Sequence, residues 1–167
     1  MPHIDPTQKM RVCRLLWEVV GLIVAEGACA EWTFPAEVSS VRRARHEVRD
    51  TLRRWRIPSS VGDVAVLLVS ELVTNSQRYA SGPIGVRLDV RPLSSGPDGA
   101  AVDTASARCA LVVEISDPVP EAPTERAAGP DDEGGRGLQL VACSARRWGT
   151  RRGKTGKTVW FELPLLG

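Results

Sequence analysis

The sequence predicts an α+β domain built around one layered sheet. Two stretches in the first half of the chain, residues 40–56 and 60–80, carry apolar residues at helical spacing. Shorter stretches that alternate or run apolar, as strands do, dominate the second half. The chain has 167 residues, 43% of them hydrophobic, and is therefore long enough for one domain with a substantial core.

The first predicted helix, residues 40–56, has an apolar stripe and carries arginines on its opposite face. The stripe consists of Val41, Ala44, Val48, Leu52 and Trp55. Pro58 is expected to end this helix. Ser60 and Asp63 have the spacing of a capping box, in which a hydroxyl and an acidic side chain satisfy the N–H groups at a helix start. They predict that the second helix begins at Ser60.

We expect five strands and one further, short helix. The strands are predicted at residues 30–36, 84–90, 109–115, 147–151 and 158–164, and the short helix at residues 137–144. Residues 93–107 and 118–135 lack periodicity and are rich in loop-forming and charged residues, so both are predicted to be connections.

Residues 1–30 are predicted to be an N-terminal extension with an apolar helix, and residues 31–167 to be the main domain. The apolar run at residues 15–25 is shorter than the ~20 residues that a membrane span needs. A signal peptide would also combine a basic start with an apolar run, but Glu18 and Glu26 argue against one. We therefore expect a helix that packs on the domain or on a partner copy.

The composition limits the classes of function. A formal net charge of +2 does not indicate direct binding of nucleic acid. Most of the basic residues are arginine, which is typical of a GC-rich genome such as an actinobacterium's. The four cysteines lie far apart, with no CxxC pair and no histidine at ligand spacing, so neither a zinc site nor a disulfide framework is expected. Free thiols in a reducing cytoplasm are the simplest interpretation.

A polar stripe runs along the second predicted helix. Glu71, Asn75 and Arg78 share a face with Val64 and Leu68. A helix edge that meets solvent would explain this pattern. The wall of a cleft would explain it as well, with a carboxylate and an amide facing a ligand and a hard cation, because an asparagine carbonyl is a suitable oxygen ligand for Mg²⁺.

Two further positions carry candidate chemistry. Asp117 directly follows an apolar strand, where an aspartate either forms a turn or accepts a hydrogen bond from the exocyclic amine of a ligand. Glycines at 134, 135 and 137 run into the start of the short helix, and such a start lets backbone N–H groups approach phosphate oxygens. Residues 153–158 (GKTGKT) are not interpreted as a P-loop, because a strand and not a helix follows them.

The order of these motifs resembles the ATP-binding domain shared by DNA gyrase, sensor histidine kinases, heat-shock chaperone ATPases and the mismatch-repair ATPase. Within that superfamily the likeness is greatest to the anti-sigma-factor serine/threonine kinases and similar actinobacterial regulators. The asparagine box corresponds to residues 71–78, the first glycine-box strand to 113–117 and the second glycine box to 135–141. The closing hairpin corresponds to residues 148–149 and 156–163.

The resemblance implies a two-layer α/β sandwich, with helices on one face of a mixed, mostly antiparallel sheet. It also implies that the domain binds ATP with Mg²⁺, between the helices and a lid. Asn75 would be the magnesium ligand, and Glu71 would be the general base that takes a proton from a serine or threonine hydroxyl. Asp117 would accept a hydrogen bond from the adenine amine, supported by Thr158 from the last strand. Arg78 belongs to the same box as Glu71 and Asn75.

The remaining site residues implied by the resemblance surround the phosphates. They come from the second glycine box and are Gly135, Arg136, Gly137 and Leu138. Residues 118–134 would form the lid over the nucleotide. The chain departs from the superfamily pattern D-x-G-x-G after Asp117, since no glycine follows until Gly129.

The implied function is a cytoplasmic kinase that regulates transcription by partner switching. It would bind a sigma factor and phosphorylate a small anti-sigma antagonist protein, without contacting nucleic acid or a membrane, and a homodimer is expected. An alternative is a non-catalytic, nucleotide-gated module that binds a partner protein. A detached histidine-kinase domain is a third hypothesis, since His46 and Glu47 match a phosphoacceptor dipeptide, but the chain lacks the four-helix dimerisation hairpin.

Overall fold

The structure is a computed structural model, and it describes residues 27–80, 82–93, 107–119 and 136–166. The described helices are α1 (Val38–Arg54), α2 (Ser59–Tyr79) and α3 (Arg136–Ser144). The described strands are β1 (Cys29–Phe34), β2 (Ile84–Pro92), β3 (Ala107–Asp117), β4 (Arg147–Gly153) and β5 (Gly156–Leu166). Every predicted element in this part of the chain is present, with bounds that differ by a few residues. The predicted apolar helix at 15–25 lies outside the described residues.

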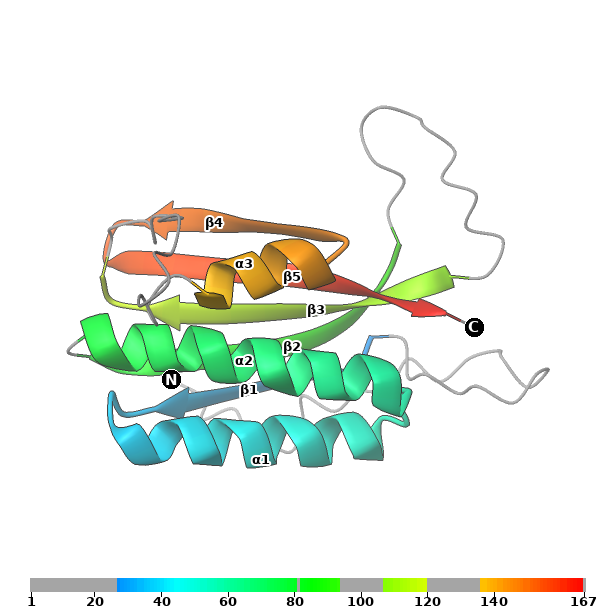
Figure 1. Cartoon of the computed structure of the whole chain (residues 1–167), viewed down its shortest axis with the longest axis horizontal. Coiled ribbons are helices and arrows are strands. Elements are labelled where there is room, and N and C mark those ends of the chain that lie inside the picture. Colours follow the sequence, from blue (N-terminus) through cyan, green and yellow to red (C-terminus); the bar gives the residue numbers. More distant parts are fainter. Residues whose placement is uncertain (1–26, 81, 94–106, 120–135, 167) are drawn as a thin grey trace, which may run out of the picture.

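The five strands form one sheet in the order β1-β2-β3-β5-β4, and each neighbouring pair is antiparallel. The hairpin of β4 and β5 places β5 directly against β3, although the two strands are far apart in the sequence (Figure 1). This pairing brings the end of β3 next to the start of β5, with Asp117 opposite Lys157.

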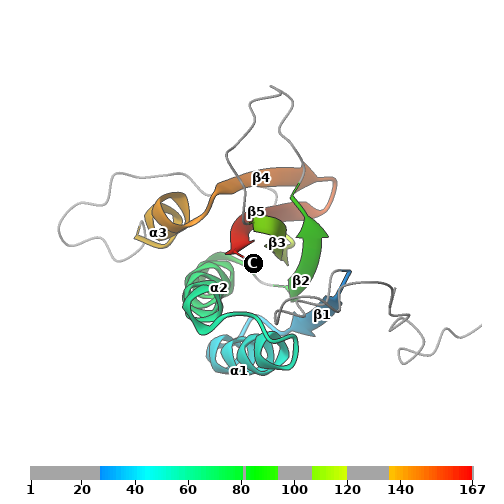
Figure 2. The same ribbon diagram turned by 90° about the vertical axis from the view of Figure 1, so that its right-hand side faces the viewer.

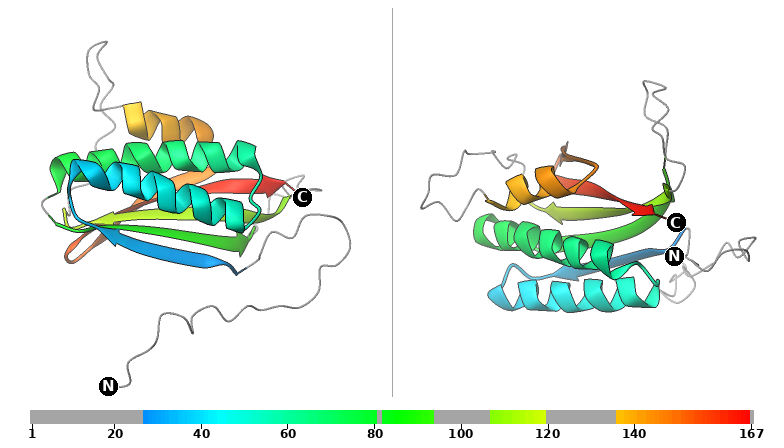
Figure 3. Two further views of the ribbon diagram at one scale, coloured as in Figure 1. Left: turned by 90° about the horizontal axis from the view of Figure 1, so that it is seen from below. Right: turned by 45° about the vertical axis from the view of Figure 1, so that its right-hand side comes forward.

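The three helices lie on one face of the sheet (Figure 2). Seen from below, α1 and α2 run side by side over the strands, with α3 beyond α2 (Figure 3). Helix α2 contacts α1, α3 and the three strands β2, β3 and β5, so it is the central helix of the layer. The predicted α+β class and two-layer arrangement are therefore confirmed.

The core fills the space between the helices and the sheet. Its largest fully buried side chains include Phe161 and Ile115 from the sheet and Leu52 and Leu68 from the helices. In β2 the predicted alternation is observed, because Ile84, Val86, Leu88 and Val90 are buried while the residues between them are partly exposed.

The predicted capping box at the start of α2 is wrong. The helix begins at Ser59 with Pro58 as its N-cap residue, and no side chain caps it. Ser60 therefore lies inside the first turn, where its hydroxyl cannot take the capping position. The carbonyl of Pro58 instead accepts the N–H groups of Val61 and Gly62.

The connection from α1 to α2 contains a backbone feature that the sequence did not predict. Arg56 has a φ of 56°, a left-handed conformation that glycine normally occupies after a helix. The N–H of the next residue, Ile57, bonds to the carbonyl of Leu52 at 3.0 Å, which closes the end of α1. In the described part of the chain, no helix is long and apolar enough to cross a membrane.

Candidate functional site

Helix α2 presents its polar residues at the boundary between core and surface. Its buried residues, among them Leu72, Val73 and Ser76, face the sheet and the neighbouring helices. Glu71 and Asn75 lie beside this buried face, one turn apart, and both are partly exposed. The stripe predicted from the sequence is therefore an edge of α2 at which a carboxylate and an amide are held by a rigid, well-packed helix.

The start of α3 lies directly against these two side chains. A Cβ atom at Gly137 would lie 3.2 Å from Nδ2 of Asn75 and 3.2 Å from Cβ of Glu71. Both separations are closer than ordinary van der Waals contact, so glycine allows the backbone of α3 to approach α2 here. The second glycine box and the asparagine box, separated by about 60 residues in the chain, meet at this point.

Asp117 is buried at the end of β3, and its carboxylate has three partners in the described residues. The hydroxyl of Ser76 on α2 donates to Oδ2 at 2.7 Å. The backbone N–H of Val119 donates to Oδ1 at 3.0 Å, and Nζ of Lys157 lies 3.2 Å from the same oxygen. The bond from Val119 makes Asp117 a turn former, as one of the two interpretations of the sequence expects.

Ser76 follows Asn75 in the chain, so α2 connects the contact at the start of α3 with the contact at the end of β3. Asn75 lies against α3, and Ser76 bonds to the end of β3. We call Glu71, Asn75, Ser76, Asp117 and Gly137 the motif junction. Sequence reasoning missed Ser76, although its position four residues after Leu72 on the buried face of the helix marks it as inward-facing.

Two glycines from other segments make room for the turn after Asp117. A Cβ at Gly156 would lie 2.1 Å from the backbone oxygen of Asp117, and one at Gly82 would lie 2.6 Å from Cγ of Pro118. Both distances are shorter than any ordinary contact. The glycines that the superfamily pattern leads one to expect after Asp117 are absent, but the segments packed against this turn carry glycine.

Lys157, and not Thr158, is the residue of β5 that contacts Asp117. Thr158 shares a hydrogen bond of 2.8 Å with Ser116. Because side chains alternate along a strand, Ser116 and Thr158 lie on the face of the sheet opposite to Asp117 and Lys157. The alternation of apolar residues in β5 indicates that Lys157 lies on the core face with Val159 and Phe161, but only the strand pairing places it opposite Asp117.

The other predicted site residues have varied positions. Arg78 is exposed in the last turn of α2. Leu138 is buried in the core, so its side chain packs α3 onto the domain. Arg136 is the first residue of α3, whereas Gly135 and most of the predicted lid lie outside the described residues.

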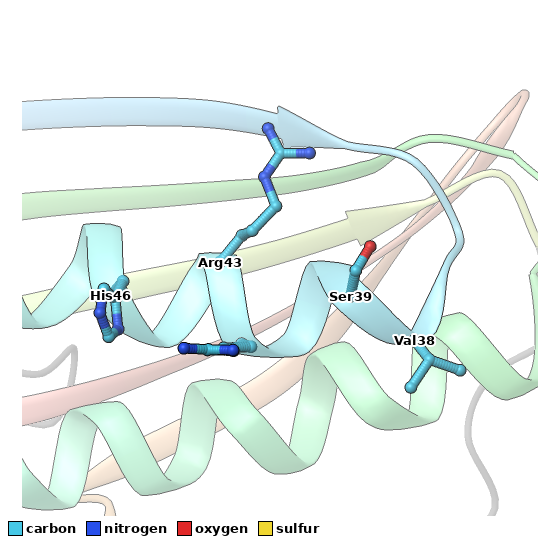
Figure 4. A pocket seen from close by; sticks show the side chains of 5 residues that line it. Val38, Ser39, Arg43 and His46 are labelled. Atoms are coloured by element: carbon cyan, nitrogen blue, oxygen red, sulfur yellow. The ribbon is translucent and has the colours of Figure 1, made fainter.

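Two surface hollows lie away from the motif junction. One is on the outer side of α1, lined by Val38, Ser39, Arg42, Arg43 and His46 (Figure 4). His46 is exposed there and lies on α1, whereas the junction residues lie on α2, β3 and α3. The other hollow is on the sheet face opposite to the helices and includes Val112, Glu114, Arg151 and Trp160.

The sheet face that carries the second hollow is rich in ion pairs. Arg151 pairs with Glu114, and Arg146 pairs with Glu162 at 2.7 Å. The nearby Cys29 is the largest influence that raises the pKa of Arg87, reinforced by neighbouring acidic residues and opposed by burial. In these pairs, oppositely charged side chains balance one another on the face of the sheet that meets solvent. Such polar faces are common in antiparallel sheets.

The described residues contain no group of three or more His, Cys, Asp or Glu side chains that could hold a metal ion. Magnesium at a nucleotide typically has one or two protein oxygens as ligands, together with substrate phosphates and water. The side-chain amide oxygen of Asn75, which lies beside Gly137, is a suitable ligand for such a site.

The chain is similar to known proteins in its sequence profile and in its fold. The profile of the histidine kinase-like ATPase domain matches residues 34–163, most of the chain. Comparison with curated protein sequences gives no significant match.

Among solved structures, the RsbU and RsbW domains of Rv1364c from Mycobacterium tuberculosis are similar in fold. The TM-score is 0.56 at 17% sequence identity, and the match covers 83% of this chain and 32% of that one. The chain thus spans about a third of the length of that protein. Together with the motif order, the profile match shows that the chain belongs to the histidine kinase-like ATPase domain family.

Proposed function

We propose that the chain binds ATP with Mg²⁺ at the motif junction and acts as an anti-sigma-factor-type serine/threonine kinase. The observation that carries the proposal is the meeting of three motifs that are distant in the sequence. Gly137 lies against Glu71 and Asn75, while Ser76 bonds to Asp117. An acceptor for a base amine at the end of β3, an amide for a cation on α2 and a glycine for close approach to phosphate on α3 thereby meet at one central helix.

Each residue of the junction has a chemical task in this proposal. The carboxylate of Asp117 accepts a hydrogen bond from the adenine amine, and Asn75 supplies an oxygen to Mg²⁺. The backbone N–H groups at the start of α3, which begins at Arg136, would donate to the phosphates. When bound, Mg²⁺ neutralises negative charge on the phosphates and holds them in position.

The proposed catalytic group is Glu71. It lies one turn before Asn75 on the same helix, close to where the terminal phosphate would be held. Glu71 would accept the proton of a serine or threonine hydroxyl. The oxygen of that hydroxyl would bond to the γ-phosphorus while the bond between the γ-phosphorus and ADP breaks. By resemblance, the hydroxyl belongs to a small antagonist protein. A sigma factor in the cytoplasm is the other partner, and the two proteins compete for binding to this chain.

Replacement of Glu71 tests the kinase directly. We expect Glu71→Gln to reduce phosphoryl transfer from labelled ATP to a candidate antagonist by about 10²–10⁴-fold, the usual contribution of a general base. Nucleotide binding should persist, because the substitution conserves shape. Glu47→Gln, an exposed glutamate on α1, is the matched control and should transfer at the wild-type rate.

The outcomes separate the competing functions. Binding of ATP without transfer to any candidate, in wild type as in Glu71→Gln, would contradict the kinase and favour a nucleotide-gated binding module. Failure of the wild-type protein to bind ATP in the presence of Mg²⁺ would contradict both.

A further inference from the structure

The pair formed by Lys157 and Asp117 is buried. Nζ of Lys157 lies 3.2 Å from Oδ1 of Asp117, and the two side chains are 10% and 2% exposed. Removing two charges from water is costly, and a buried ion pair often stabilises a fold no better than apolar residues of the same size would. We therefore explain this pair by the orientation that Lys157 gives to the Asp117 side chain, and not by stability alone.

The two oxygens of Asp117 are used unequally. Oδ1 has both the N–H of Val119 and the ammonium group of Lys157, which fill its acceptor capacity. Oδ2 has one partner among the described residues, the hydroxyl of Ser76. Among the described residues, one acceptor position on Oδ2 is thus without a donor.

The position of Lys157 is set by strand pairing and by a close backbone approach. Asp117 and Lys157 are directly opposite each other in the β3–β5 ladder. Gly156, the residue before Lys157, lies so close to the Asp117 carbonyl that no side chain would fit. The pairing of β3 with β5 therefore fixes the position from which the ammonium group of Lys157 contacts Oδ1.

We propose that Lys157 is a positioning residue that sets the base specificity of the nucleotide site. By occupying Oδ1, it orients the Asp117 side chain so that the remaining acceptor position of Oδ2 serves an exocyclic amine. A group that only accepts hydrogen bonds favours a 6-aminopurine and disfavours the 6-oxo group of guanine. This inference rests on the proposed ATP binding and adds the residue that makes Asp117 selective.

The test compares ATP with purine riboside triphosphate, which lacks the 6-amino group, and with GTP. In wild type, we expect ATP to bind about ten- to a hundredfold more tightly than purine riboside triphosphate, the range for one hydrogen bond to a charged group. In Lys157→Met this preference should fall to less than about threefold, because ATP affinity drops while affinity for the analogue is unchanged. Lys157→Arg should retain most of it.

Lys154→Met is the matched control, since Lys154 is an exposed lysine in the turn of the same hairpin. It should bind all three triphosphates as wild type does. An equal loss of affinity for ATP and the analogue in Lys157→Met would mean a merely structural role and would overturn the inference. A gain in ATP affinity would overturn it too, because Lys157 would then compete with the base.

A double variant keeps the test decisive if Lys157→Met does not fold. Asp117→Asn and Asp117→Asn/Lys157→Met should show the same ratio of ATP to analogue affinity, because Lys157 acts through Asp117. A further fall of the ratio in the double variant would contradict the inference. If wild type binds neither ATP nor the analogue, the proposed function itself fails, which is a different result.

Discussion

At the scale of single residues, two glycines in the first turns of helices have opposite surroundings. A Cβ at Gly137 would press on Asn75 and Glu71, whereas nothing lies within 4 Å of a Cβ at Gly62 in α2. Glycine at 137 therefore serves the contact between α3 and α2. At Gly62 the backbone freedom of glycine only disfavours the helix.

We expect Gly137→Ala to displace Glu71 and Asn75 by a few tenths of an ångström and to lower phosphoryl transfer by about tenfold or more, because catalysis is sensitive to small misplacements. Stability should change by less than about 1 kcal/mol, since alanine favours the helix. Enzyme assays and urea unfolding measure the two effects.

Gly62→Ala is the control for that variant. It should keep wild-type activity and raise the free energy of unfolding by about 0.5–1 kcal/mol. Full activity in Gly137→Ala would show that the close approach of α3 to the two side chains has no functional importance.

At the scale of elements, the joint between α1 and α2 contains backbone strain that substitution can relieve. Arg56 adopts a left-handed conformation at the end of α1, with a φ of 56°. This conformation costs an L-residue about 1–2 kcal/mol relative to its preferred regions. The joint nevertheless forms, because Ile57 closes the helix end with a hydrogen bond and is itself buried.

We expect Arg56→Gly to raise the free energy of unfolding by about 0.5–1 kcal/mol, since glycine adopts this conformation without strain but loses more entropy on folding. Arg53→Gly, an exposed position within α1, should instead destabilise by about 0.5–1 kcal/mol. Chemical denaturation of both variants is the measurement. Destabilisation by both would mean that the strain at Arg56 is not significant.

The elements themselves were largely predictable, because periodicity is a local property. The spacing of Ala44, Val48 and Leu52 predicted α1, and the alternation of Ile84 to Val90 predicted β2. The cap of α2 was not predictable in the same way. Ser60 has the chemistry of a helix cap, but α2 begins one residue earlier, at Ser59, and its N-cap residue is Pro58.

At the scale of the whole molecule, stability depends on the single core between the helix layer and the sheet. Phe161 is fully buried on β5, which lies between β3 and β4 and under α2. Its neighbour Trp160 has the opposite parity and lies over Gly149, on the face away from the helices. Substituting each aromatic residue in turn therefore separates the contribution of the core to the free energy of unfolding from that of the outer face.

We expect Phe161→Ala to lower the free energy of unfolding by about 3–5 kcal/mol, because it removes a large buried side chain and leaves a cavity. Trp160→Ala should cost less, since its side chain is only partly buried. Urea unfolding followed by circular dichroism gives both values. Equal losses would contradict the assignment of one core to the helix side of the sheet.

The sequence by itself determined the class of fold and the main chemical groups of the site. Helical and strand periodicity are encoded within a few residues, and Glu71, Asn75, Asp117 and Gly137 stand in motifs that are recognisable in order. It did not reveal that Lys157, and not Thr158, contacts Asp117, or that Ser76 joins α2 to β3. It also did not reveal that Gly82 and Gly156 accommodate the turn after Asp117. These relations depend on which strands pair, in which register and how closely, and segments separated by about 40 residues acquire them only when the core forms around them.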